Sequence, residues 1–225
     1  MSEISFKERV KNILIDESKA YKQNYVDYEY LICSNAFKIK DSYIIDAKED
    51  NYQHLTGVHS LISPQDFFNK CYNGTLSEND FDFIKRRQSE KSVKGSVRRK
   101  IKVLPNMMNI FQKDIMVEET FVKNKVTCAF ATTDQQCTLG FVDNLKARPM
   151  SLIKGNELND NKAQRINLLL RKKSDEEKFN EVMIGDLKTL LQYYSTIKNY
   201  IDENIIQSQI KTSEDETAAS SEIKN

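Results

Sequence analysis

The chain is 225 residues long, with 30% charged residues, 39% hydrophobic residues and a formal net charge of +1. Its mean hydropathy of −0.61 is typical of a soluble protein, and its length fits one domain that can bury a core. The opening MSEISFKERVKN is charged, which excludes a secretory signal, and no apolar run approaches the roughly 20 residues that cross a bilayer. We therefore expect a cytoplasmic protein with no membrane partner.

The four cysteines, Cys33, Cys71, Cys128 and Cys137, show no CxxC pair and no histidines at zinc spacing. Scattered cysteines in a reducing compartment act most often as small buried hydrophobic residues, so we expect free thiols and no bound metal. The chain also lacks a phosphate-binding glycine loop, a Rossmann fingerprint, HExxH and GxSxG, and it has only six glycines. We therefore expect no cofactor.

Apolar residues recur at helical spacing near the start of the chain and predict a helix over residues 4–23. The runs YEYLIC and SYIIDA, rich in tyrosine and isoleucine, predict two short strands. The stretch NYQHLTGVHS comes directly after the second strand and holds both histidines of the chain, His54 and His59. We interpret it as a loop between a strand and a helix.

Capping signals predict where the next helices begin. In SPQDFFNKCYNG, Ser63 is suited to be an N-cap, Pro64 fits the first helical position, and Gly74 closes the C-terminus. Ser77 and Asp80 have the same capping spacing and predict that a further helix begins in SENDFDFIKRR.

Residues 85–102 carry nine Lys or Arg against the single acid Glu90, a local charge of +8. We predict a helix here, because its apolar residues advance by steps of three or four: Val93, Val97, Ile101, Leu104, Met108 and Phe111. Pro105 should break or kink this basic helix.

Short runs rich in β-branched and aromatic residues follow Asp114 and predict four or five antiparallel strands, with EVMIGD as a small edge element. From Asp186, apolar residues at helical spacing predict a long amphipathic C-terminal helix. Helices followed by strands, without βαβ alternation, indicate an α+β fold. We expect one domain over residues 1–210 and a disordered acidic tail over 211–225.

The basic helix is the clearest functional signal. A solvated charged face explains most runs of Lys and Arg, but like charges on successive turns repel, and an anion would relieve that repulsion. Nucleic acid is one such anion, because Lys and Arg release counterions when they neutralise phosphates. An acidic protein partner and the chain's own acidic tail are the alternatives.

His54 has the residue type that proton transfer at neutral pH requires. Cleavage of RNA without a metal needs a base for the 2′-hydroxyl, an acid for the leaving oxygen, and cations for the charge on phosphorus. His54 can be the base, and Thr56 and Gly57 can approach a phosphate closely. Arg98, Arg99 and Lys100 can supply cations if the basic helix packs beside the histidine stretch. In the simpler interpretation, His54 is a structural residue.

The order YLICSNAF, YIIDA, NYQHLTGV, DFFNKCYNGTL and KGSVRRKIKVL resembles the phage- and mobile-element-borne nuclease domains grouped with barnase, EndoU, the tRNase colicins and RelE. It is most similar to the fourth phage-associated subtype, through its aromatic-x-His-Leu-Thr-Gly-Val block. The resemblance implies N-terminal helices and a basic helix packed on a small antiparallel sheet, and RNA cleavage without metal. It supports His54, Thr56, Gly57 and Lys100, and more weakly Ser151 in RPMSL.

We therefore predict a metal-independent endoribonuclease that cleaves by 2′-hydroxyl transesterification and acts as a toxin, a phage-defence effector or a phage-encoded factor. The catalytic residues are predicted to be His54, Lys100 and Ser151. Substrate binding is assigned to Thr56, Gly57, His59, Lys94, Arg98 and Arg99. The acid stays open between His59, Tyr52 and Ser151. Expected partners are RNA and an antitoxin or inhibitor protein.

Two other functions remain open from the sequence alone. One is a non-catalytic module that binds nucleic acid or an acidic protein through the basic helix, such as an inhibitor of a host nucleic-acid complex. The other is a scaffold that assembles through the C-terminal helix, although most amphipathic helices cover their own core. The RNA substrate and the oligomeric state are not determined by these patterns.

Overall fold

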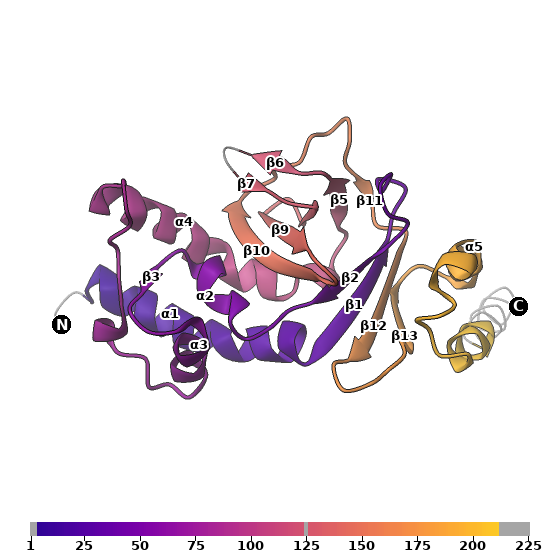
Figure 1. The fold of residues 1–225 in the computed structure, drawn as a ribbon, viewed down its shortest axis with the longest axis horizontal. Helices are drawn as coiled ribbons and strands as arrows, with labels where there is room; N and C mark the ends of the chain where they lie inside the picture. Colours follow the sequence, from indigo (N-terminus) through magenta and orange to yellow (C-terminus); the bar gives the residue numbers. More distant parts are fainter. Residues whose placement is uncertain (1–3, 124–125, 212–225) are drawn as a thin grey trace, which may run out of the picture.

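A curled sheet of nine strands forms the centre of the molecule (Figure 1), and this computed structural model describes residues 4–123 and 126–211. The strand order is β11-β5-β8-β9-β10-β2-β1-β12-β13. The strands are β1 Tyr28–Cys33, β2 Tyr43–Asp46, β5 Met116–Glu119, β8 Phe130–Thr133, β9 Cys137–Asp143, β10 Ala147–Lys154, β11 Gln164–Arg165, β12 Leu168–Lys173 and β13 Glu181–Ile184. Two short ribbons pair β3 His59–Ser60 with β4 Phe81–Asp82 and β6 Val122–Lys123 with β7 Val126–Thr127.

The α+β class is correct, but the small antiparallel sheet predicted from the resemblance is wrong. The sheet is large and mixed, because β10 pairs with β2 in parallel, whereas its other ladders are antiparallel. This parallel ladder joins the first two strands of the chain to those after residue 115. The two groups of strands were therefore predicted correctly, but not their pairing into a single sheet.

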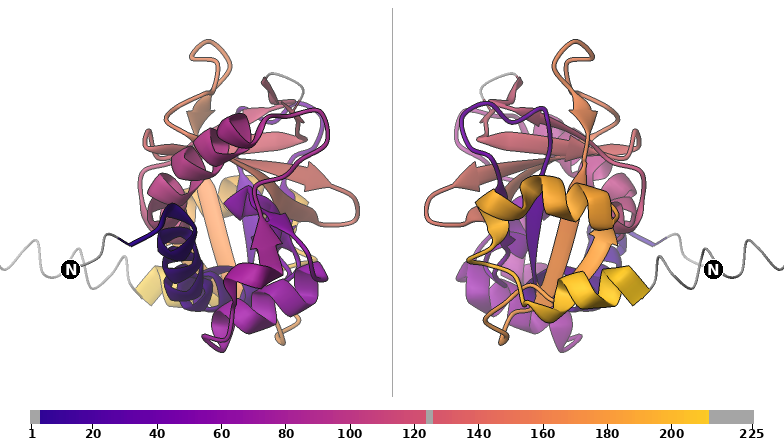
Figure 2. Two further views of the ribbon diagram at one scale, coloured as in Figure 1. Left: turned by 90° about the vertical axis from the view of Figure 1, so that its left-hand side faces the viewer. Right: turned by 90° about the vertical axis from the view of Figure 1, so that its right-hand side faces the viewer.

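The helices gather mainly at one end of the molecule, and α5 lies at the opposite end (Figures 1 and 2). They are α1 Phe6–Tyr21, α2 Asn51–Thr56, α3 Pro64–Tyr72, α4 Glu90–Met108 and α5 Leu187–Ile197. A π-helical turn at Lys22–Val26 extends α1, and short 3-10 turns lie at Glu78–Asp80 and Ile110–Gln112. No helix in the described ranges is long and apolar enough to cross a membrane.

Both faces of the sheet are covered, which explains why YEYLIC reads as a nearly continuous apolar run. Tyr30 and Ile32 of β1 join a helix-side core, which also contains buried residues of α1, α2, α3 and α4. Leu31 and Cys33 point to the other face and join an α5-side core, which contains Leu190 of α5. A third, smaller core is formed by Phe121, Cys128, Ala131 and Leu158.

Of the two helix starts predicted from capping signals, one is correct. Ser5 caps α1, and the predicted helix after residue 63 is α3, where the Ser63 hydroxyl accepts a hydrogen bond from the Asp66 amide and Pro64 stands first. The capping box at Ser77 and Asp80 is also present, but it opens only a 3-10 turn. The predicted helix is wrong here, because Phe81 and Phe83 alternate into the core and the chain pairs as β4 with β3.

The predicted basic helix is confirmed from Glu90 onward as α4, whereas residues 85–89 lie outside it, and the helix does not break at Pro105. The helix continues to Met108 because Leu104, Met107 and Met108 remain packed in the helix-side core. Its last carbonyls have partners outside the helix: the Tyr25 hydroxyl donates to Met107 O at 2.6 Å. Tertiary contacts thus offset the hydrogen bond that proline removes.

The predicted long C-terminal helix is interrupted. α5 ends at Ile197, and a second helix covers 204–211. Between them the chain extends so that Ile201 pairs with Phe179, whose amide donates to Tyr200 O at 2.8 Å. Burial of Ile201 and Phe179 therefore outweighs continuous helical periodicity. Apart from Lys211, which is helical, the acidic tail predicted to be disordered lies outside the described residues.

Candidate functional site

The histidine stretch interpreted as a loop contains helix α2. Tyr52 and Leu55 anchor its inner face in the helix-side core, while the side chain of His54 is exposed. The helix ends at Gly57, whose φ of +81° lies in the left-handed region that favours glycine. The resulting turn fixes His54 at the end of a short rigid helix rather than on a mobile loop.

Lys100 joins α4 to α2. Its Nζ donates to the backbone oxygen of His54 at 3.0 Å. On the way, its side chain crosses Gly57 so closely that a methyl group there would lie 2.8 Å from Lys100 Cδ. Glycine is therefore required at 57 for two reasons, its conformation and the passage of Lys100. The structure brings His54, Gly57 and Lys100 together.

Lys100, which contacts His54, and the neighbouring Lys85 both have lowered pKa values. Burial, together with the neighbouring Lys85, lowers the pKa of Lys100 from 10.5 to about 8. Burial also lowers the pKa of Lys85. Neither lysine has an ion-pair partner among residues 4–123 and 126–211. Unpaired, partly desolvated ammonium groups are costly, and a bound anion would stabilise their charged forms.

His59 forms a separate pair with Asp82 across the β3–β4 ribbon. Its Nδ1 lies 2.9 Å from Asp82 Oδ1, and the Ile84 amide also donates to that oxygen at 2.9 Å. Burial alone would raise the pKa of Asp82, but the Ile84 amide, His59 and Lys7 lower it below its ordinary value. The carboxylate therefore stays charged and orients the half-exposed ring.

The other predicted cations of α4 point away from Lys100. The Arg98 guanidinium lies over the Phe6 ring of α1, 4.9 Å from its centroid. Lys94 forms an ion pair with Glu90 at 2.6 Å and lies near the Phe83 ring. Arg99 is exposed. Lys94 and Asp82 line one shallow pocket. The cations of α4 therefore lie on two surfaces, one at this pocket and one at α2 beside Lys100.

Thr56 and Tyr52 are engaged inside the protein. The Thr56 side chain is fully buried, and its hydroxyl donates to Gln53 O at 2.7 Å. Tyr52 is also fully buried, and its hydroxyl donates to Leu14 O at 2.7 Å. Burial, with minor contributions from nearby groups, raises the pKa of Tyr52 well above its usual value. Both side chains hold α2 in place and do not face solvent.

Ser151 lies on the opposite face of the sheet from α2 and α4. It pairs with Gly140 on β9, where a methyl group would lie 2.6 Å from Cys128 Sγ. Ser151 therefore faces the smallest core, whereas the next residue, Leu152, joins the helix-side core with Leu55. The structure does not bring Ser151 together with His54.

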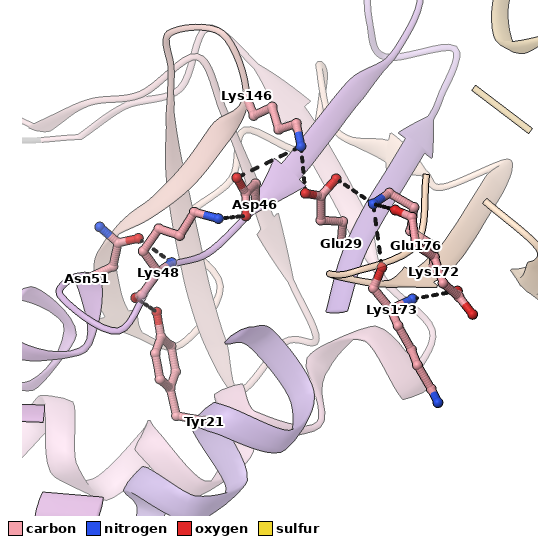
Figure 3. A network of polar contacts seen from close by, with 9 residues as sticks. All are labelled: Tyr21, Glu29, Asp46, Lys48, Asn51, Lys146, Lys172, Lys173 and Glu176. Atoms are coloured by element: carbon pink, nitrogen blue, oxygen red, sulfur yellow. Dashed lines mark hydrogen bonds and ion pairs between the residues drawn. The ribbon is translucent and has the colours of Figure 1, made fainter. Parts of the chain in front are cut away.

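A row of charges at the end of the central strands was not predicted (Figure 3). This charge row consists of Glu29, Asp46, Lys48, Lys146 and Lys172. Glu29 stands opposite both Asp46 and Lys172 in the ladders of β1. The sequence does contain a signal, because YEYLIC and YIIDA each hold a single acid within an apolar strand.

The cysteine, histidine and acidic side chains of residues 4–123 and 126–211 are the potential metal ligands of this part of the chain. All four cysteines are free and buried, as expected. In the described parts of the chain, no group of three or more His, Cys, Asp or Glu side chains is placed to hold a metal ion.

An exposed histidine whose backbone oxygen binds an unpaired lysine is an arrangement compatible with phosphodiester chemistry, and comparison with known families identifies the class as a nuclease. Residues 13–224 match the model of the phage-Barnase-EndoU-ColicinE5/D-RelE like nuclease4 family, and the chain belongs to this family. The resemblance stated from the sequence is thus confirmed. No curated protein and no solved structure matches the chain.

Proposed function

We propose that the protein is a metal-independent endoribonuclease whose centre is formed by His54 and Lys100. The observation that carries this proposal is the contact between Lys100 Nζ and the backbone of His54, in a place where burial and Lys85 lower the lysine pKa to about 8. An ammonium group has three donors, and this contact uses one. The remaining donors, at the backbone of the exposed His54, suit a phosphodiester.

In this mechanism, His54 accepts the proton of the 2′-hydroxyl. The 2′-oxygen then forms a bond to phosphorus, and the bond between phosphorus and the 5′-oxygen breaks. The leaving oxygen takes a proton from an acid, and the products are a 2′,3′-cyclic phosphate and a free 5′-hydroxyl. Lys100 and Lys85 stabilise the negative charge on the phosphoryl oxygens.

Of the three acids considered, we assign this role to His59. Tyr52 is buried with a raised pKa, and Ser151 is on the far face of the sheet. His59 is half-exposed and oriented by Asp82, so its free ring nitrogen can carry a proton to a substrate. An imidazole that is aligned by a carboxylate is well suited to proton transfer.

The test is cleavage of single-stranded RNA in the presence of EDTA. His54→Ala should lower the rate by about two to four orders of magnitude, the usual contribution of acid–base catalysis. Lys91→Ala, at an exposed position of α4, is the matched control and should retain the rate. Thermal unfolding of each variant separates lost chemistry from lost fold. Full cleavage by the His54 variant would refute the assignment.

A non-catalytic binding module is the second candidate, and one observation favours it. Within residues 85–102, the only basic side chain with an ion pair in the described structure is Lys94. The other cations are available for a polyanion. This function predicts salt-sensitive RNA binding without product, lost on Arg98→Glu with Arg99→Glu and retained in His54→Ala.

Because the family is phage-associated, we propose that the nuclease acts in the conflict between phages or other mobile elements and their hosts, as a toxin or effector. A protein that inhibits it would have to cover the exposed ring of His54 and the flank of α4 at Lys100.

A further inference from the structure

In the charge row the carboxylates are buried and the lysine ammonium groups lie at the surface. Glu29 and Asp46 are 5% and 8% exposed, whereas the side chains of Lys146 and Lys48 are 39% and 46% exposed. Lys146 Nζ lies 2.5 Å from Glu29 Oε1, and Lys48 Nζ lies 2.7 Å from Asp46 Oδ1. The acids therefore fix the lysine amines at the surface of the sheet.

Such an arrangement is poorly explained by stability alone. Desolvation of charges costs free energy, and well-packed apolar residues in place of a buried ion pair often give equal or greater stability. Glu29 and Lys172 are both nearly buried, with Nζ and Oε2 3.2 Å apart. Departures of this kind from apolar packing are expected mainly at functional sites.

Cations exceed acids in the row. Three lysines surround the two carboxylates, and the exposed Arg148 stands beside them. Arg148 follows Ala147, which pairs with Ile45 and points into the helix-side core, so Arg148 lies on the same face as Asp46. Lys48 and Lys146 keep ammonium protons that their carboxylate contacts do not use.

The acids of the row lie on the face of the sheet opposite the helix-side core, and the backbone of Lys48 links the row to α2 (Figure 3). The Tyr21 hydroxyl of α1 donates to Lys48 O at 3.0 Å, and the Lys48 amide donates to Asn51 Oδ1 at 2.9 Å. Asn51 is the first residue of α2, which carries His54. Lys48 is therefore held in a fixed position close to the start of that helix.

We propose that the charge row is a second phosphate-binding site, which holds the backbone of a single-stranded RNA through Lys48 and Lys146. This inference rests on the proposed ribonuclease function and extends it from one scissile phosphate to a longer strand. Glu29 and Asp46 act as positioning residues, because they orient the two amines and do not themselves touch the substrate.

The test uses a fluorescently labelled 2′-O-methyl oligouridylate, which has RNA phosphates but no free 2′-hydroxyl, so it cannot be cleaved. Its affinity for the full chain is measured over a series of salt concentrations. Lys48→Ala should lower the slope of log affinity against log salt by about 0.7, the value for one lost phosphate contact on a single strand.

Lys70→Ala is the matched control. The side chain of Lys70 is 40% exposed and forms an ion pair with the nearly buried Asp80, and no second cation pairs with Asp80 in the described structure. Its loss should leave the slope unchanged. Equal slopes for the Lys48 and Lys70 variants would overturn the proposal and make the charge row structural.

A second set of variants applies if removal of Lys146 alone unfolds the protein. Lys146→Arg keeps the charge above Glu29 and should keep the slope, whereas Lys146→Met with Glu29→Gln should lower it by about 0.7. Because the probe is not cleaved, these results do not depend on His54. If the Lys48 and Lys146 variants reduce the slope but His54→Ala still cleaves RNA, only the catalytic assignment of His54 is refuted.

Discussion

At Gly57 the backbone is left-handed, with φ at +81°, and the side chain of Lys100 occupies the space where another residue would place its Cβ. Gly74, after α3, has a similar φ of +71°, but no atom lies within 4 Å of that space. The two glycines therefore share a conformation and differ in their surroundings. A comparison of alanine variants at the two glycines therefore distinguishes the effect of backbone strain from the effect of displacing Lys100.

Gly57→Ala and Gly74→Ala should each lower the free energy of unfolding, because a left-handed alanine costs about 1–2 kcal/mol. Only Gly57→Ala should also reduce RNA cleavage, since its methyl group pushes Lys100 away from His54. Urea unfolding and cleavage rates measure the two effects. Equal activity in both variants would show that the position of Lys100 is unimportant for the reaction.

The sequence indicated His54, Gly57 and Lys100 as members of one site, and the structure brings these three into contact. The sequence did not indicate that the Thr56 hydroxyl is buried or that Ser151 faces the other side of the sheet. Such facts depend on side-chain direction, which a motif does not specify. They follow from the register of β10 and from the turn that ends α2.

At the scale of elements, α5 shows how an amphipathic helix is positioned. Leu190 is fully buried in the α5-side core, whereas the next residue, Leu191, is 52% exposed. The helix therefore covers its own sheet, as the intramolecular interpretation of the sequence requires. The exposed side of α5 faces solvent (Figure 2).

Leu190→Ala should lower the free energy of unfolding by about 2–5 kcal/mol, the usual range for a buried leucine. Leu191→Ala should change it by less than about 0.5 kcal/mol, as at most surface positions. Denaturant titrations of both variants provide the comparison. Similar values would mean that α5 does not cover this face of the sheet in solution.

Periodicity predicted the long elements and failed on short ones. α4 was predictable because its apolar residues recur over five turns, and β1 and β2 because they are rich in tyrosine and isoleucine. α2 has six residues, and β11 has two, too few for a period to emerge. The size of the sheet depends on pairings such as β2 with β10, which no local pattern specifies.

At the scale of the whole molecule, each of the three cores contains at least one cysteine. Cys71 and Cys137 lie in the helix-side core, Cys33 in the α5-side core, and Cys128 in the smallest core. Burial is the largest cause that raises the pKa of Cys33, Cys71 and Cys137 to about 12 and that of Cys128 to about 11. Little thiolate, the reactive form, is therefore present at neutral pH.

We expect the native protein not to react with a thiol reagent, and all four cysteines to become reactive in one transition as denaturant is added. This outcome follows if residues 1–210 form a single domain whose cores open together. Mass spectrometry of labelled peptides identifies which thiol reacts. Reaction of Cys33 at a lower denaturant concentration would show that the α5-side core unfolds separately.

The ladder between β1 and β12 has a consequence for protein synthesis. β1 ends at Cys33 and its partner begins at Leu168, so about 135 residues must be translated before this pairing can form. At roughly 5–20 residues per second, about 7–27 s pass before β12 can pair with β1, whose other edge already has β2 as its partner. The central sheet is thus completed only when most of the chain has been made, and until then β1 keeps one edge without a neighbouring strand.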